Sequence, residues 1–307
     1  MKPKQSIPKE LRYTVSDFNR EFPNDDACLE HIKEQLWPKG VTHCEKCGVE
    51  RKHHRVSGRT AYACGHCGNH IYPLAGTVFE KSTTSLKTWF YAMYLMGSTR
   101  CGISAKQIQR ETGVTYKTAW RMFRQIRSLL SEDGLQLEGS TVDMDEMYHG
   151  GKRQRQGQRG RPSFGSHEVP VVGMVERRTD GKVGRVIARV APDAKKETLH
   201  GLAKEYILPS STVFTDEYVS YDGLQNLGYV HRRIRHSAKV YVAGDVHTQT
   251  IEGFWSLVKR GIGGVYHNVS GKYLQTYLDE YSFRFNRRDR GNLLFRAILE
   301  QVSRRAS

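Results

Sequence analysis

Two Cys-x-x-Cys motifs constrain the fold of this chain more than any other feature. Cys44 and Cys47 form the first motif and Cys64 and Cys67 the second, with 16 residues between them, and a glycine follows each motif. Four thiolates at this spacing are typical of a tetrahedral zinc site, and glycine permits the positive φ of a knuckle turn. We therefore predict one structural Zn²⁺ within residues 38–80, whose four protein ligands leave no open position for catalysis. Two disulfides or buried free thiols are the alternatives.

The charge balance indicates a polyanionic partner. The chain has 307 residues, with 48 Lys and Arg against 32 Asp and Glu, a formal charge of +16. Such a surplus favours binding to nucleic acid or to an anionic membrane surface. The membrane is excluded as a partner because no apolar run approaches the roughly 20 residues that span a bilayer, and the N-terminus lacks the apolar core of a signal peptide. Six cysteines without an export signal favour a reducing compartment, so we expect a cytoplasmic protein.

A helix-turn-helix is predicted within residues 82–132, after an N-terminal segment over residues 1–37 that ends in a short helix. Ser104 can cap one helix, Gly113 can form the turn, and Thr115 can cap the next helix. The second helix could enter the major groove of DNA. A plain helical bundle with solvated basic faces is the alternative. The cationic residues expected to point outward from this helix are Lys117, Arg121, Arg124 and Arg127.

An acid-rich strand follows, ending at Tyr148. Asp143 and Asp145 fall on one face of this strand, because alternate residues of a strand share a face. Such a concentration of acids is unfavourable for a purely structural strand and favours a metal site, although an edge strand with a solvated acidic face is also possible. The basic stretch that comes next contains Lys152, Arg153 and Arg155, which we interpret either as disordered or as a phosphate clamp on DNA.

The order of elements over residues 138–270 predicts an α/β domain of the ribonuclease-H-like type. After the acidic strand, residues 169–175 and 183–190 are predicted to form a hairpin, residues 194–207 a helix, and residues 212–215 a buried strand that delivers Asp216 at its end. A helix over residues 218–227 and a strand over residues 229–234 complete the sheet.

The last element of this domain is an amphipathic helix over residues 247–260. Glu252 and Lys259 lie seven residues apart and therefore project from one face, while Phe254 and Trp255 are expected to anchor the helix in the core. Alone, the two charges could be a solvated surface pair. Together with Asp145 and Asp216, however, Glu252 completes a set of three carboxylates. Such a set suits two Mg²⁺ or Mn²⁺ ions and in-line phosphoryl displacement.

Ordered motifs along most of the chain resemble the DDE transposases of bacterial insertion sequences, specifically the zinc-ribbon type of the insertion sequence 1595 family. Besides the cysteine motifs, they are Gly76–Phe79, Thr118–Met122, Val142–Tyr148, Gly150–Lys152, Thr215-Asp216 with Ser220-Tyr221, Ile251–Trp255, Lys259-Arg260 and Arg284–Arg288. The resemblance implies that Asp145, Asp216 and Glu252 bind the catalytic metals and that Lys259 is a transposition-associated base. Asp143 is often Glu in relatives, which implies a place beside the site rather than a metal ligand.

The implied function is transposition. A protein of this kind would bind the terminal inverted repeats of an element and cleave and transfer DNA strands with Mg²⁺ or Mn²⁺. It would act in the bacterial nucleoid as a homo-oligomer on double-stranded end and target DNA. The alternatives are a zinc-ribbon and helix-turn-helix regulator that has lost catalysis, and a ribonuclease or repair nuclease. Residues 271–307 are expected to be helical and to pack on the catalytic domain, with arginines that face either DNA or solvent: Arg284, Arg287, Arg288 and Arg290.

Overall fold

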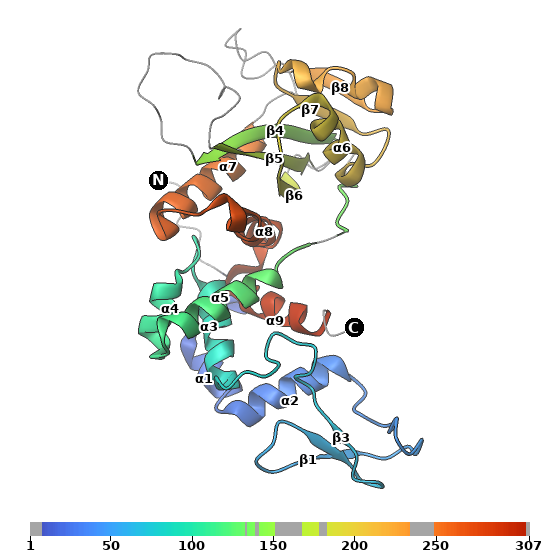
Figure 1. The fold of residues 1–307 in the computed structure, drawn as a ribbon, viewed down its shortest axis with the longest axis vertical. Coiled ribbons are helices and arrows are strands. Elements are labelled where there is room, and N and C mark those ends of the chain that lie inside the picture. Colours follow the sequence, from blue (N-terminus) through green and yellow to red (C-terminus); the bar gives the residue numbers. More distant parts are fainter. Residues whose placement is uncertain are drawn as a thin grey trace. The chain divides into compact units, whose positions relative to one another are not determined.

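The computed structural model describes residues 8–132, 134–138, 141–150, 168–177, 183–233 and 249–304 (Figure 1). The chain divides into two units, one made of residues 1–129 with 289–307 and the other of residues 130–288. In the part of the chain that the structure describes, no helix is both long enough and apolar enough to cross a membrane.

The first unit begins with helices and a small antiparallel sheet. Thr14 and Asp17 form a capping box at the start of the first helix, and Asn24 caps the second. The sheet joins the second helix through the Tyr62 hydroxyl, which donates to Glu30 at 2.7 Å. These elements are η1 (Lys9–Leu11), α1 (Val15–Glu21), α2 (Asp25–Leu36), β1 (His53–Arg55), β2 (Tyr62–Cys64) and β3 (His70–Ile71).

Three further helices follow with the caps that the sequence predicts. Ser104 accepts from the backbone of Gln107, Gly113 adopts a φ of 70°, and Thr115 accepts from the backbone of Thr118. The helices are α3 (Leu86–Ser98), α4 (Ala105–Thr112) and α5 (Tyr116–Ser128). Local side-chain chemistry therefore determines where α4 ends and α5 begins.

The C-terminal helix α9 (Leu294–Arg304) packs on α3 in the first unit (Figure 1). A Cβ atom at Gly97 of α3 would lie 2.6 Å from the backbone nitrogen of Phe295, so the two helices approach closely at this glycine. The buried ring of Phe295 also contacts Phe18 and Tyr94. Residues 271–307 are therefore divided between the two units. Only the helix that precedes η6 (Arg288–Leu293) belongs to the second unit, whereas α9 belongs to the first.

The second unit contains a five-stranded sheet in the order β6-β5-β4-β7-β8. The first three strands are antiparallel and β7 and β8 run parallel to β4. The strands are β4 (Thr141–Gly150), β5 (Glu168–Arg177), β6 (Val183–Val190), β7 (Thr212–Thr215) and β8 (Val230–Arg233). The remaining elements are α6 (Lys196–Tyr206), η2 (Val219–Tyr221), η3 (Leu224–Leu227), α7 (Gln249–Gly261), the π-helical turn η5 (Ile262–Tyr266) and α8 (Gly271–Asn286).

The helix predicted over residues 218–227 is replaced by the two short turns η2 and η3. Gly223 and Gly228 have φ values of 94° and 87°, which no α-helix accommodates, so the segment turns after three or four residues. The prediction of a single helix over these residues is therefore wrong.

Helix α8 covers the edge strand β6 with amide side chains. Asn286 accepts from the Val186 N–H at 2.7 Å and donates to the same residue's carbonyl, and Gln275 makes the equivalent pair of bonds to Val190 and Ala188. These bonds satisfy backbone groups that an edge strand otherwise leaves open.

The expectation that the arginines of residues 271–307 face DNA or solvent is wrong for Arg284, which is buried against Glu280, and for Arg287, which pairs with Glu132.

Candidate functional site

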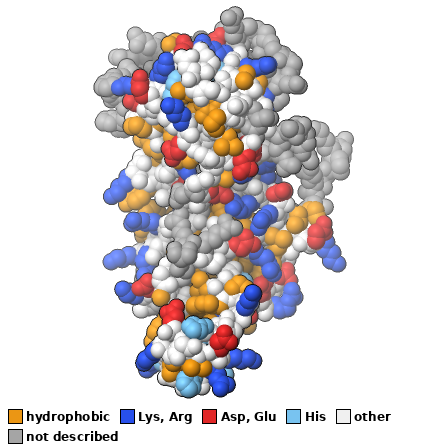
Figure 2. Space-filling model, turned by 90° about the vertical axis from the view of Figure 1, so that its right-hand side faces the viewer, with side chains coloured by type: hydrophobic (Ala, Val, Ile, Leu, Met, Phe, Trp, Pro, Cys, Tyr) orange, Lys and Arg blue, Asp and Glu red, His pale blue; other side chains and the backbone are white. Residues whose placement is uncertain are grey.

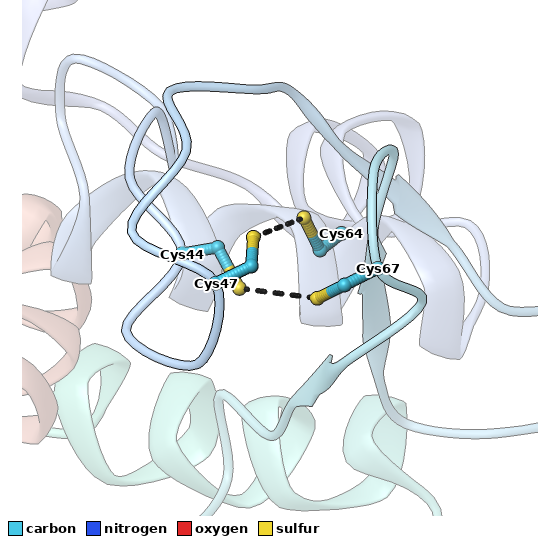
Figure 3. A group of neighbouring side chains, drawn as sticks. All are labelled: Cys44, Cys47, Cys64 and Cys67. Carbon is cyan, nitrogen blue, oxygen red and sulfur yellow. Dashed lines mark hydrogen bonds between the residues drawn. The ribbon is translucent and has the colours of Figure 1, made fainter.

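The four motif cysteines converge on one point in the first unit (Figure 3). Their sulfur atoms all lie within 4.8 Å of one another; the Cys44 and Cys67 sulfurs are 3.6 Å apart and those of Cys47 and Cys64 are 4.0 Å apart. All four are free thiols, so the disulfide alternative does not describe this structure. Four sulfurs at such distances are suited to tetrahedral zinc.

Two knuckle turns create this arrangement. Gly48 and Gly68 have φ values of 67° and 70°, and their N–H groups donate to the carbonyls of Cys44 and Cys64 at 2.8 and 3.0 Å. Backbone N–H groups of Cys47 and Lys46 lower the pKa of Cys44 to about 6, because they stabilise the thiolate. The turns therefore prepare a deprotonated ligand for a cation.

The basic face of α5 lines a groove of about 720 Å³. Lys117, Arg121 and Arg124 are exposed there, and Arg121 donates to the Ser82 hydroxyl at 3.2 Å. Arg127 does not share this face: it is 1% exposed, and its guanidinium lies 3.7 Å from the centre of the Phe123 ring. The prediction that it points outward is wrong, because a residue one turn after Phe123 lies on the buried side of the helix.

The other predicted basic contacts, Lys152, Arg153 and Arg155, lie outside the described residues. Elsewhere, Lys and Arg side chains are exposed at many places on the face drawn in Figure 2.

Asp145 and Asp216 come from adjacent parallel strands of the second unit. The pairing of β4 with β7 ends where Asp143 is matched with Phe214, and Asp145 and Asp216 each lie two residues beyond that pair. The charge of Asp216 acts on Asp145, which shows that the two carboxyl groups are near one another. Asp216 stands directly after β7, where its Oδ1 accepts from the Tyr218 N–H at 2.9 Å.

Helix α7 brings Glu252 and Lys259 to the same cleft as Asp145. The cleft has a volume of about 480 Å³, and Glu146, Tyr148, Trp255, Ser256 and Arg260 also line it. Glu252 and Lys259 are exposed on α7, whereas Ile251, Phe254 and Val258 on the opposite face are buried. The helix therefore has an apolar side that packs against the sheet and a charged side that faces the cleft.

The three predicted carboxylates do not converge as tightly as the cysteines. Among the described residues, the four cysteines are the only group of three or more ligand atoms close enough to hold one ion. Asp145 and Glu252 line the cleft, whereas Asp216, which directly follows β7, does not. The structure thus places all three acids in one region and leaves them further apart than a fully formed metal centre.

The charge in this region nevertheless fits a divalent cation. Burial, followed by repulsion from Glu146 and then Asp216, raises the pKa of Asp145 to about 7, although a hydrogen bond from Trp255 opposes the shift. A carboxyl group that is difficult to ionise among other carboxylates is one whose charge a bound Mg²⁺ or Mn²⁺ would offset.

Glu146 is a cleft residue that the sequence reasoning did not single out. Its Oε2 accepts from the hydroxyl of Tyr221 at 2.7 Å, and Tyr221 is completely buried. Burial and the charge of Glu146 raise the pKa of Tyr221 well above 10, so the phenol remains a donor at neutral pH. The signals in the sequence were the acid next to Asp145 and the Tyr shortly after Asp216.

Asp143 lies away from the cleft. It is fully buried and forms an ion pair with Arg177, whose Nη2 is 2.6 Å from Oδ1. Arg177 in turn lies over the Phe214 ring. Although Asp143 shares a strand face with Asp145, its charge is therefore already compensated within the protein.

Most of the chain is similar to known transposase domains or to proteins of transposable elements. Residues 136–286 match the ISXO2-like transposase domain and residues 23–70 match the transposase zinc-ribbon domain. The chain is 30% identical over 279 residues to an uncharacterized protein in transposable element ISH50 of Halobacterium salinarum, which covers 86% of this chain and 92% of that relative. It is also 30% identical to an uncharacterized transposase-like protein of Haemophilus influenzae over 102 residues, 33% of this chain and 81% of that relative.

Proposed function

Because the chain belongs to the family of ISXO2-like transposases, we propose that it is an active DDE-type DNA transposase that binds the terminal inverted repeats of an insertion sequence and catalyses Mg²⁺-dependent strand cleavage and strand transfer. The observation that carries this proposal is the cleft that Asp145, Glu252 and Lys259 line together, with Asp216 directly after the adjacent strand β7. The cleft lies within the part of the chain that matches the transposase domain.

The topology of the second unit supports a ribonuclease-H-like catalytic domain. Three antiparallel strands followed by two parallel ones, with β4 in the centre, form a sheet of this type. Asp145 lies on the central strand β4, Asp216 directly follows the neighbouring parallel strand β7, and α7 supplies Glu252. The resemblance that the sequence motifs carry thus agrees with the order of the strands.

The residues of the cleft have distinct roles in this proposal. Divalent cations, when bound, polarise the attacking oxygen and stabilise the leaving oxygen of the phosphodiester. Asp145, Asp216 and Glu252 would hold them, while Lys259 and Arg260, which also line the cleft, would contact a DNA phosphate. Water and then a DNA 3′-hydroxyl serve as nucleophiles, so no covalent bond to the protein forms.

The first unit would recognise the DNA ends. The exposed cations of α5 line an open groove, and the cysteine cluster would stabilise the small sheet beside α2 by binding Zn²⁺. Basic side chains in a groove neutralise phosphates and fix the register of the protein on the duplex. We expect the functional form on two DNA ends to be a homo-oligomer.

The test is the Asp216→Asn variant on a DNA duplex that carries the end of the element. We expect Mg²⁺-dependent strand cleavage to be lost, with end binding unchanged. Glu217→Gln is the matched control, because it removes an exposed carboxylate one residue further along and should retain cleavage. Undiminished cleavage by Asp216→Asn would remove Asp216 from the site. End binding by a wild-type protein that never cleaves would instead favour the regulator.

A further inference from the structure

Trp255 contacts Asp145 directly. Its indole Nε1 donates a hydrogen bond to Asp145 Oδ2 at 3.0 Å, and the side chain is only 4% exposed. Trp255 also lines the cleft between Asp145 and Glu252, so the donor lies inside the region that carries the acids. The sequence pattern predicted Trp255 only as an apolar anchor of α7, and its polar edge was not considered.

A glycine on the neighbouring strand makes room for this indole. Gly173 of β5 is the residue paired with Asp145 of β4. A Cβ atom at Gly173 would lie 2.5 Å from Cζ2 and 2.7 Å from Cη2 of Trp255, closer than real Cβ atoms approach other atoms. Any side chain there would therefore displace the ring, and with it the donor that reaches Asp145.

The remaining contacts fix the ring from the helix side. Phe254 lies beside it, with ring centroids 5.3 Å apart, and Ile251 of the same helix also reaches Gly173. The indole thus lies between α7 and the backbone of β5, with its N–H directed at Asp145. A donor that packing holds in this way restricts the rotation of the carboxylate that it contacts.

We propose that Trp255 is a positioning residue that holds the Asp145 carboxylate in the orientation that binds the divalent cation. The space left by the missing side chain of Gly173, here called the notch, allows the indole to take this place. The proposal rests on the proposed function, since it assumes that Asp145 is a metal ligand. Asp145 has Glu146 and Asp216 as acidic neighbours, and their charges repel its carboxylate. Loss of a donor behind a metal ligand lowers metal affinity by about 10- to 100-fold.

The chain supplies a matched control. The indole of Trp89 is completely buried and donates to the Ser82 hydroxyl at 2.9 Å, but Trp89 belongs to the first unit and Asp145 to the second. Trp255→Phe and Trp89→Phe therefore remove the same kind of group and the same kind of hydrogen bond. Only the first loses a contact to a proposed metal ligand.

The experiment measures Mn²⁺ binding to the full-length, zinc-loaded protein by electron paramagnetic resonance of the free ion. The site is defined as the Mn²⁺ binding that wild type shows and Asp145→Asn loses. For this site we expect Trp255→Phe to raise the dissociation constant by about 10- to 100-fold, and Trp89→Phe to leave it within about twofold. Circular dichroism at each Mn²⁺ concentration checks that the variants are folded.

A second variant separates the hydrogen bond from packing. Benzothienylalanine at position 255 keeps the bicyclic shape of the indole and replaces its N–H with sulfur. It should therefore weaken Mn²⁺ binding as Trp255→Phe does. This result would exclude destabilisation by the smaller Phe ring as the cause. Wild-type affinity in the benzothienylalanine protein, or an equal loss in Trp89→Phe, would overturn the positioning role. Wild-type protein without any Asp145-dependent Mn²⁺ binding would refute the proposed function itself.

Discussion

Replacing Asp145 with Asn is expected to stabilise the folded protein in the absence of divalent cations. The native carboxyl lies among acids, and burial together with the charges of Glu146 and Asp216 raises its pKa from 3.8 to about 7. Asn has nearly the same shape, carries no charge, and can still accept the hydrogen bond from Trp255. The substitution therefore removes an unfavourable charge and keeps the contact.

The size and the sign of the effect follow from the pKa of Asp145. The folded protein holds this proton more tightly than the unfolded chain, so ionisation favours unfolding as the pH rises from about 4 to about 7, and the cost is constant above that. A raised pKa of this size corresponds to about 4 kcal/mol at pH 8 and about 2 kcal/mol at pH 5. Only well below pH 3.8 is the carboxyl protonated in both states, and there the advantage of Asn disappears.

Urea unfolding at pH 5, 6.5 and 8 checks this prediction, provided that the probe reports on the second unit. Trp255 is the only tryptophan between residues 130 and 288, so 5-fluorotryptophan labelling and ¹⁹F NMR follow that unit separately. Adding Mg²⁺ should stabilise wild type and leave Asp145→Asn unchanged, because a ligand stabilises only the protein that binds it.

Asp193 provides the control of opposite sign. Hydrogen bonds from the Thr198 hydroxyl and the Lys195 N–H lower the pKa of Asp193, so Asp193→Asn should not stabilise the protein at pH 8. An Asp145→Asn variant that is no more stable than wild type at pH 8, or equally stabilised at pH 5 and pH 8, would refute the reasoning.

Two further predictions concern the first unit. Cys64→Ser should remove one of four zinc ligands, and we expect zinc content measured by mass spectrometry to fall and the ribbon signal in circular dichroism to change; unchanged zinc content would contradict the site. Arg124→Ala should weaken binding to DNA of any sequence and lower the slope of log affinity against log salt by about 1. Arg20→Ala on α1, which also removes an exposed arginine, should leave the slope unchanged. Equal slopes for the two variants would place Arg124 outside the interface.

Local signals in the sequence predicted the helices of the first unit well. The caps at Ser104 and Thr115 and the left-handed Gly113 depend on residues within one turn, and all three are confirmed. The burial of Arg127 could be read from its helical phase with Phe123, but a basic residue in a basic helix was assigned to the surface by its charge.

Features that depend on distant contacts were not predictable from the sequence. The packing of α9 on α3 requires Gly97 to meet Phe295, almost 200 residues away, and neither residue indicates the other. The pair of Arg284 with Glu280 is four residues apart on α8, so helical spacing could have indicated it. Arg287 looked like part of a basic patch because its partner, Glu132, becomes a neighbour only in the folded unit. Spacing along the chain cannot supply such pairs.

The candidate site also combines features that local spacing predicts with features that depend on distant contacts. That Glu252 and Lys259 share a face of α7 follows from helical spacing, and the structure brings both to the cleft of Asp145. The bond from Trp255 to Asp145 and the notch at Gly173 depend instead on the register between β4 and β5. A sequence pattern identifies which residues are acids but not which donors lie behind them.

The energetics of Asp145 bear on the choice between an active transposase and a regulator that has lost catalysis. In a protein that binds no divalent cation, this carboxylate costs about 4 kcal/mol at pH 8, and a single substitution to Asn would remove the cost. A regulator would therefore gain stability by losing the acid, since neither the zinc ribbon nor the α5 groove uses it. Strained or mutually repelling groups persist where function requires them. The presence of Asp145 beside Glu146 and Asp216 is thus easier to explain if a cation offsets their charge, and this supports the proposal of an active transposase.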